Sequence, residues 1–356
     1  MPLSPQMPAP AIWLEWLDPM SVVNLIAVAG TVALALAAYR LLGTLGVARR
    51  AQWAAAILTL PSAAFNALLM GQCDAIYVAA CVMAVAMAIE RRHLAMFVWC
   101  GIAIAFKAQA ALAAPFFLAI AIRRRVPFHH WLAAPAALLA MMVPALLAGW
   151  PPADLATIYF RQAGTFSGDI ARNAPNIWSL AGTISPAYAP QLFGLALAAA
   201  LGTAATYVAR MQVVHFDKAG LVGMAALAVL LSAGLLPRMH ERYFLLADIL
   251  IFAFAVAKGT RSALTLAALV QLGSAAAIIG YFGLGAPLVA LGAVCMIAAT
   301  WIAAQPLIAP HANDNRDGSH RIPPPHGLRG TLSFDMMSAP VAGPRGSKVY
   351  VWEQDA

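Results

Sequence analysis

The chain has 356 residues, of which 62% are hydrophobic and 10% are charged, and its mean hydropathy is +0.78. Soluble domains are about 45–50% apolar and about 25% charged, so this composition excludes a water-soluble globule and predicts a polytopic membrane protein. The formal net charge is +8, but the basic residues occur in short clusters between apolar runs. This distribution argues against a nucleic-acid-binding surface.

Apolar runs between polar or basic residues predict an all-α fold, a bundle of eleven membrane-spanning helices within residues 21–304. The predicted spans are 21–39, 52–70, 75–89, 94–106, 109–122, 131–149, 190–209, 219–236, 244–257, 262–280 and 287–304. Four prolines within these runs, Pro61, Pro115, Pro135 and Pro144, predict kinks or broken helices.

The positive-inside rule orients the predicted bundle. Twelve basic residues fall in alternate connections, which we assign to the cytoplasm: Arg40, Arg49, Arg50, Arg91, Arg92, Arg123, Arg124, Arg125, Arg210, Lys218, Lys258 and Arg261. We therefore expect the N-terminal segment, residues 1–20, to lie outside. Residues 305–356 contain three consecutive prolines and few aliphatic runs, a composition that predicts a disordered cytoplasmic tail.

The stretch between His93 and Arg123 is short for two complete crossings. Two passes of about 14 residues each span only about 21 Å at a rise of 1.5 Å per residue. A hairpin that turns near Lys107 would place its amine in the outer half of the membrane. The alternative is one long tilted helix from which Lys107 snorkels to the surface.

Polar residues concentrate in the connections assigned to the outer side. They are Gln72 and Asp74, then Lys107 and Gln109, then the long connection 150–189, then the segment from Arg238 to Tyr243. A charged side chain at membrane depth costs a few kcal/mol (about 2.5–3.5 on insertion scales), so ionisable groups gathered on one side predict a functional site.

Two of these segments carry the candidate chemistry. Asp74 begins a predicted span, where it would cap the helix, contact a substrate, or do both. Arg238 and Arg242 suit bidentate phosphate binding, while His240 and Glu241 suit acid–base or hydrogen-bonding roles. The alternative for this segment is a water-exposed turn in which Glu241 neutralises an arginine.

The connection 150–189 is about 40 residues long, which favours a folded lid or substrate-binding element over a solvated loop. It carries Arg161, Arg172 and Asn176. Asp248, two turns into the next predicted helix, is expected to pair with an arginine or to join the same polar pocket. The four cysteines show no metal-ligand spacing. The outer carboxylates could hold a divalent ion, but no spacing predicts one, so no cofactor is assigned.

In these segments the sequence resembles the polyprenyl-phosphate-sugar-dependent membrane glycosyltransferases of the GT-C superfamily, particularly bacterial mannosyltransferase-like members. The resemblance covers roughly residues 50–260. It rests on Pro61 to Asn66, Gly71-Gln72-Cys73-Asp74-Ala75-Ile76-Tyr77, Phe106-Lys107-Ala108-Gln109 with Pro115, Asn173-Ala174-Pro175-Asn176-Ile177-Trp178, and Met239-His240-Glu241-Arg242-Tyr243.

The resemblance implies a multi-pass protein of the bacterial inner membrane with a periplasmic active face. Its donor would be a polyprenyl-phosphate sugar, with a mannose-like hexose, and its acceptor a glycan, lipid or protein. Among the site residues, Asp74, Glu241 and His240 would be catalytic. The substrate-binding set would be Gln72, Lys107, Gln109, Arg161, Arg172, Asn176, Arg238, Arg242 and Tyr243.

The resemblance does not extend to the start of the chain. We expect the first helix of the family and its large outer loop, which holds the principal catalytic carboxylate, to be missing, and neither Glu15 nor Asp18 matches that acid. Two other hypotheses therefore stay open. One is a transporter or flippase of lipid-linked sugars, and the other is an inactive, noncatalytic relative.

Overall fold

The computed structural model describes residues 19–69, 72–164, 170–181 and 189–309, and within these ranges it is helical, with no β-strand. All of them belong to one compact unit within Met1–Asp314. The all-α prediction is confirmed for the described part of the chain. The expected N-terminal segment lies almost wholly outside the described residues, as does nearly all of the expected tail.

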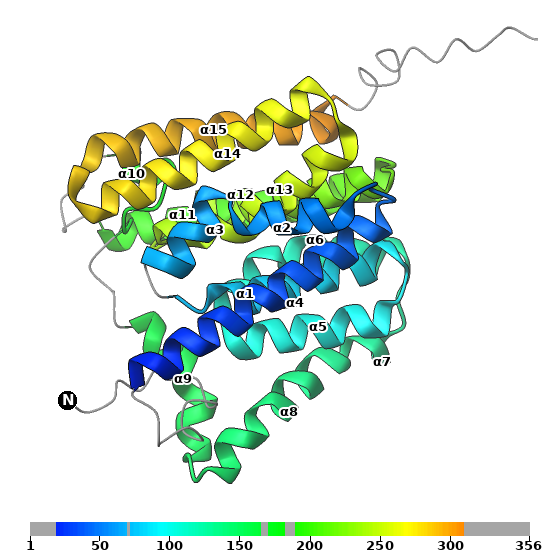
Figure 1. Cartoon of the computed structure of the whole chain (residues 1–356), viewed down its shortest axis with the longest axis vertical. Coiled ribbons are helices and arrows are strands. Elements are labelled where there is room, and N and C mark those ends of the chain that lie inside the picture. Colours follow the sequence, from blue (N-terminus) through cyan, green and yellow to red (C-terminus); the bar gives the residue numbers. More distant parts are fainter. Residues whose placement is uncertain (1–18, 70–71, 165–169, 182–188, 310–356) are drawn as a thin grey trace, which may run out of the picture. The chain divides into compact units, whose positions relative to one another are not determined.

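The first half of the chain forms helices α1 to α8 (Figure 1). Their bounds are α1 Pro19–Thr44, α2 Arg50–Leu58, α3 Pro61–Ala64, π-helix η2 Phe65–Leu69, α4 Asp74–Ile89, α5 His93–Phe106, 3-10 helix η3 Ala108–Ala113, α6 Ala114–Arg123, α7 Phe128–Trp131 and α8 Ala133–Leu147. Helix α4 packs between α1 and α5, and α5 packs against α8.

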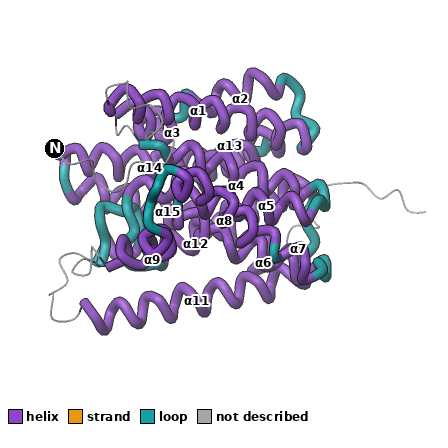
Figure 2. Tube along the Cα trace, turned by 90° about the horizontal axis from the view of Figure 1, so that it is seen from below, coloured by secondary structure: helices purple, strands orange, loops and turns teal. Residues whose placement is uncertain are grey.

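The second half begins with two helices in the connection 150–189 and ends with a helical hairpin. The bounds are α9 Pro152–Gly164, α10 Ile177–Leu180, α11 Ala189–Val213, α12 Lys218–Leu235, 3-10 helix η5 Glu241–Phe244, α13 Leu245–Lys258, α14 Arg261–Ile279, π-helix η6 Gly280–Leu284 and α15 Ala286–Ile308. Helices α14 and α15 pack along each other, and α11 lies at an edge against α6 and α12 (Figure 2).

The core is formed by α4, α12 and α13, whose residues are mostly buried. Many of these residues are alanines, and small side chains let helix backbones approach closely. The contact between α5 and α8 depends on Gly101, because a Cβ atom there would meet the carbonyl group of Ala134. Likewise, a Cβ at Gly292 would lie 2.7 Å from the carbonyl oxygen of Gly273.

Six described helices are long and apolar enough to cross a membrane: Ser21–Thr44, Phe128–Leu147, Gln191–Val213, Lys218–Leu235, Arg261–Gly283 and Ala286–Ile308. Three shorter apolar helices, Asp74–Ile89, His93–Phe106 and Ala108–Arg123, accompany them. The membrane protein class is thus supported, while the count of eleven spans stays a prediction.

The structure corrects two of the predicted element boundaries. The expected span 52–70 is broken into α2, α3 and η2, because Pro61 begins α3 and cannot continue the hydrogen bonding of the preceding helix. The expected tail boundary at residue 305 is also wrong, since α15 continues through Pro306 to Ile308.

The chain reverses at Lys107, as the hairpin prediction requires. Lys107 has an extended backbone, with φ −158° and ψ 128°, between α5 and η3. On the return pass, the Arg124 guanidinium donates to the carbonyl oxygen of Ala88 near the end of α4. The two ends of the hairpin therefore lie together, which excludes one long helix through this stretch.

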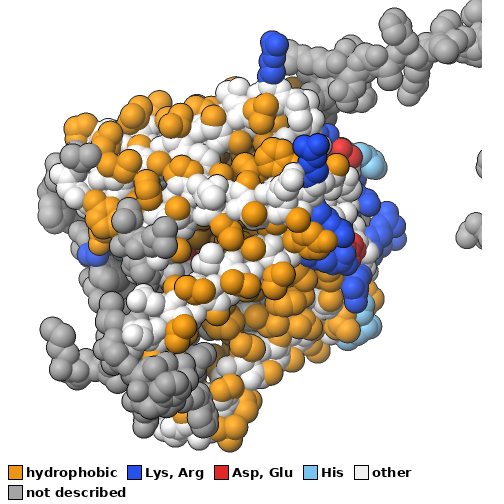
Figure 3. All heavy atoms as spheres, viewed as in Figure 1, with side chains coloured by type: hydrophobic (Ala, Val, Ile, Leu, Met, Phe, Trp, Pro, Cys, Tyr) orange, Lys and Arg blue, Asp and Glu red, His pale blue; other side chains and the backbone are white. Residues whose placement is uncertain are grey.

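One end of the bundle gathers the basic residues that follow or precede helices (Figure 3). There Arg40 forms an ion pair with Glu90 at 2.7 Å, and Lys258 forms one with Asp217 at 2.9 Å. The Lys218 ammonium donates to the carbonyl oxygen of Thr44 at 3.5 Å. We call this the basic end; connections predicted to share one side of the membrane meet here.

Candidate functional site

Asp74 begins α4, at the opposite end of this helix from Glu90. With 16 residues, α4 separates Asp74 from the basic end by about 24 Å. The Asp74 side chain is 1% exposed, and it does not cap the helix, because the cap position is Cys73, which makes no side-chain cap bond. Its carboxylate instead accepts hydrogen bonds from the Lys107 ammonium and from the Asn66 amide, the latter at 3.0 Å.

Arg242 joins Asp74 to a second buried carboxylate. Its Nε lies 3.8 Å from Oδ2 of Asp74, and its Nη1 donates to Oε1 of Glu241 at 3.1 Å. Glu241 is buried, and its Oε2 lies 3.8 Å from Nδ1 of His240. Together Asp74, Lys107, Glu241 and Arg242 form a network that we call the ion-pair cluster.

Electrostatics keep Glu241 ionised despite its burial. Burial by itself would raise the pKa of this carboxyl, but the neighbouring His240 imidazole, hydrogen bonding to its own backbone and the charge of Arg242 lower the pKa below its ordinary value. A carboxylate that is charged at neutral pH can accept hydrogen bonds from a hydroxyl group.

Gln109 and Tyr243 extend the cluster. The Gln109 amide donates to the Tyr243 hydroxyl at 2.8 Å, and the Tyr243 and His240 rings meet edge to face with centroids 5.2 Å apart. Burial raises the pKa of the Tyr243 hydroxyl, and Asp74 and Glu241 add to this effect. Tyr243 therefore stays neutral and can donate or accept a hydrogen bond.

The connection 150–189 reaches the cluster through residues 170–173. The Arg172 amide donates to the Met239 carbonyl at 3.0 Å, and the Arg238 amide donates to the Ile170 carbonyl at 2.8 Å. Both Asn173 (φ 53°) and Arg238 (φ 61°) adopt the left-handed conformation that favours glycine. Such backbone strain in non-glycine residues is concentrated at functional sites. This part of the connection is folded, as predicted.

Two predicted binding residues, Arg161 and Asn176, have side-chain contacts that indicate other roles, and a third, Gln72, has a backbone contact. Arg161 forms an ion pair with Asp154 within α9 at 3.0 Å, and its side chain is 58% exposed. The buried Asn176 caps α10 by accepting from the Ser179 amide, and its own amide group donates to the Ala233 carbonyl at the end of α12. The Gln72 backbone amide donates to the Asn66 carbonyl, which closes the turn before α4.

Asp248 contradicts the expectation of an arginine partner or of a place in this cluster. It is 1% exposed, and both its carboxyl oxygens contact the Ser274 hydroxyl, at 2.9 and 2.8 Å. Ser62 is a neighbour of Asp248, and its hydroxyl donates to Oε1 of Gln271 at 3.2 Å. Sequence reasoning missed this hydroxyl cluster, because serines in apolar helices give no distinctive signal.

Sequence reasoning also left Asn66 without a role, although it holds Asp74 directly. The available signal was its place eight residues before Asp74, as a polar side chain within an apolar stretch. It lies in η2, and π-helical turns are frequent at functional sites.

The cluster retains hydrogen-bonding capacity for an anion. Among the described residues, Arg242 uses one of the five N–H donors of a guanidinium group, and Lys107 uses one of three. Both side chains keep an exposed fraction, 20% for Arg242 and 25% for Lys107. The two carboxylates balance these two cations, and Arg172 adjoins the segment 239–242 through its backbone.

The carboxylates of Asp74 and Glu241 are the side chains of the cluster that have the chemistry of metal ligands. Both carboxylates are engaged with cations, and within the described ranges no group of three or more His, Cys, Asp or Glu side chains is placed to hold a metal ion.

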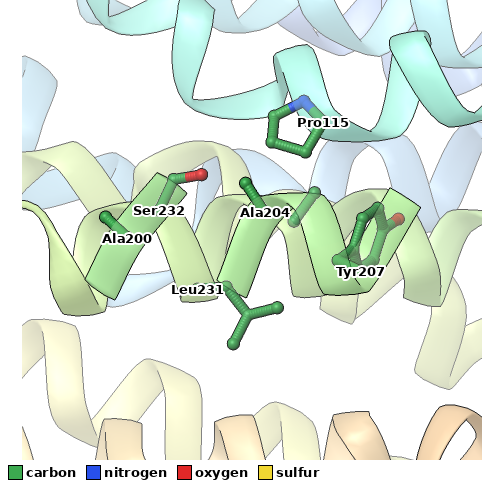
Figure 4. A pocket seen from close by; sticks show the side chains of 7 residues that line it. Pro115, Ala200, Ala204, Tyr207, Leu231 and Ser232 are labelled. Carbon is green, nitrogen blue, oxygen red and sulfur yellow. The ribbon is translucent and has the colours of Figure 1, made fainter. Parts of the chain in front are cut away.

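A separate void of about 10 Å³ lies between α6, α11 and α12, next to Pro115, Tyr207 and Ser232 (Figure 4). It is at the lower limit of the space that one water needs.

Comparison of the sequence with protein-family models and with curated proteins gives no match.

Proposed function

We propose that the protein is an integral membrane glycosyltransferase that moves a sugar from a polyprenyl-phosphate donor to an acceptor at the outer face of the membrane. The observation that carries this proposal is the ion-pair cluster. It joins three segments far apart in the sequence, around Asp74, Lys107 and Arg242, at the end of α4 remote from the basic end.

The cations would bind the donor phosphate. Lys107 and Arg242 are held in place by Asp74 and Glu241, and their remaining N–H donors suit the oxygens of a phosphate. Preorganised donors of this kind stabilise negative charge as it develops on a leaving group. Arg172 and Arg238 would add attraction for the anionic headgroup.

One of the two carboxylates would take up the proton of the acceptor hydroxyl. In the transfer, the acceptor oxygen forms a bond to the anomeric carbon while the bond from that carbon to the phosphate oxygen breaks. The acceptor proton passes to a carboxylate, and polyprenyl phosphate leaves with the bonding electrons. Glu241, ionised and next to His240, is one candidate for this base, and Asp74 is the other.

The finer topology belongs to the same proposal. Eleven crossings, an outer N-terminus and a cytoplasmic tail would place the cluster at the periplasmic face of a bacterial inner membrane. The separation of the basic end from the ion-pair cluster along α4 supports this orientation through the positive-inside rule.

A transporter or flippase of lipid-linked sugars is the second candidate, and Asp248 is the observation that favours it. An acid buried among apolar helices is a common feature of transport pathways. The enzyme is preferred because the charged groups that could bind phosphate gather at one end of the bundle.

The test is a transfer assay with membranes that contain the full chain and a radiolabelled polyprenyl-phosphate mannose. We expect the label to reach an acceptor, and we expect Arg242→Ala and Lys107→Ala to reduce the rate at least about a hundredfold. Arg92→Ala, an exposed arginine at the basic end, is the matched control and should keep full activity. Movement of intact donor across the membrane without bond cleavage would favour the transporter instead.

A further inference from the structure

The basic end carries more positive charge than its acids can balance. Glu90 accepts hydrogen bonds from both Arg40 and Thr44. Asp217 accepts from Lys258 and from the Gly220 amide, where it caps α12. Both carboxylates at this end are therefore already engaged.

Five exposed arginines at this end have side chains for which the described residues provide no hydrogen bond or ion pair: Arg49, Arg91, Arg92, Arg125 and Arg261. Their guanidinium groups face solvent or the surrounding lipid. Because a guanidinium group offers paired donors in a fixed plane, such a set matches phosphate oxygens well.

Three of these arginines occupy backbone positions that favour glycine. Arg49 has φ 55°, Arg91 has φ 60° and Arg125 has φ 49°. They lie in three separate turns, between α1 and α2, between α4 and α5, and between α6 and α7. Glycine adopts this conformation without the steric cost that a side chain incurs. The positive-inside rule orients the helices if each turn carries a cation at any position. It does not explain why the arginine occupies the one residue of the turn with a strained backbone.

The surroundings of these turns suit the membrane interface. Trp53 in α2 and Phe128 in α7 are exposed large aromatics close to them, and Leu36 and Ile122 expose apolar surface on adjoining helices. Aromatic side chains are enriched at the level of lipid headgroups. An anion bound by the three arginines would thus sit at the edge of an apolar, lipid-facing surface.

We propose that Arg49, Arg91 and Arg125 form a binding surface for the phosphate of anionic phospholipids in the leaflet that the basic end faces. Each of these arginines lies in a turn that joins two helices, and each is exposed. The lipid is the occupant, rather than a soluble phosphate, because the arginines border exposed apolar helix surface on which acyl chains can pack.

The test measures the thermal unfolding midpoint of the full chain in detergent with added phosphatidylglycerol or phosphatidylcholine. Phosphatidylglycerol should raise the midpoint of the wild-type protein, and phosphatidylcholine should not. In the triple variant Arg49→Gly, Arg91→Gly, Arg125→Gly, the concentration of phosphatidylglycerol needed for half of this rise should increase roughly a hundredfold.

The unfolding midpoint of the same triple variant without anionic lipid distinguishes lost lipid binding from lost structure. Without anionic lipid, its unfolding midpoint should equal or exceed that of the wild-type protein, because glycine relieves the strain in the three turns. If the triple variant fails to fold, the single variant Arg91→Gly should show a smaller weakening in the same direction.

A matched control removes equal charge elsewhere: Arg316→Gly, Arg321→Gly, Arg329→Gly. This variant should respond to phosphatidylglycerol like the wild-type protein. An equal loss in both triple variants, a full response in the turn variant, or the same rise with inorganic phosphate alone would overturn the proposal. None of these readouts depends on sugar transfer.

Discussion

Asp74 and Asp248 are equally buried acids in apolar helices, yet their surroundings differ. Asp74 is bound by the Lys107 ammonium and the Asn66 amide and lies 3.8 Å from the Arg242 guanidinium. Asp248 contacts the hydroxyl group of Ser274 and neighbours Ser62. The comparison teaches that burial of an acid does not identify a charge-binding site. The residues that contact the acid identify it. Of these two aspartates, only Asp74 is contacted by cationic side chains among the described residues.

The largest expected effect is at Asp74. Removing one member of a buried ion pair leaves the other charges uncompensated, at a cost of about 3–5 kcal/mol. We therefore expect Asp74→Ala to lower the free energy of unfolding by about that amount, measured by thermal or denaturant unfolding in detergent. The added substitution Lys107→Met should recover part of the loss, and a double variant less stable than Asp74→Ala would refute the pairing.

A smaller effect is expected at the hydroxyl cluster. Ser274→Ala leaves the buried carboxyl of Asp248 without its closest partner, which costs about 1–3 kcal/mol. The same unfolding measurement checks this value. Thr300→Ala is a matched control, because its hydroxyl only contacts the Met296 carbonyl within its own helix.

Asp248→Asn should lower the free energy of unfolding by still less, about 1 kcal/mol, because an amide can also form hydrogen bonds with serine hydroxyls. Asp74→Asn should be far more harmful, since it removes a charge that two cations depend on. Equal losses in these two isosteric variants would remove the distinction between the two aspartates.

The smallest effect is the dependence of stability on pH at Glu241. The pKa of this carboxyl lies below its ordinary value of 4.5 in the folded protein. Its stabilisation is therefore complete above about pH 4.5 and is lost as the pH falls through the lower, folded value. We expect the midpoint difference between the wild-type protein and Glu241→Gln to shrink as the pH falls from 7 to 3. A difference that grows on acidification would contradict the assignment.

Much of this cluster was predictable, because charge placement follows simple rules. The basic turns indicated which connections share a side, and Asp74, Lys107, Gln109 and the segment around Arg242 then had to lie on the other side. The structure brings these residues together. Sequence alone could not show that Asp74 binds Lys107 rather than capping α4, because both roles use the same residue at the same position.

Other features could not be predicted, since they depend on packing across distant segments. Arg161 and Asn176 share the polar connection with Arg172, but α9 and α10 give them local partners. The break of the predicted span 52–70 follows from Pro61, yet the π-helix that aims Asn66 at Asp74 has no comparable signal. Asp248 was misassigned because its neighbours are two serines on other helices.

Phosphate-dependent lipid binding tests the central claim most directly. The purified full-length protein is titrated with polyprenyl phosphate and with the corresponding polyprenol, and binding is measured by native mass spectrometry. We predict that the wild-type protein binds the phosphate form at least about tenfold more tightly, and that Arg242→Gln and Lys107→Gln each abolish this preference while Arg92→Gln keeps it. Equal binding of the two lipids by the wild-type protein, or an unchanged preference in both cluster variants, would contradict the account.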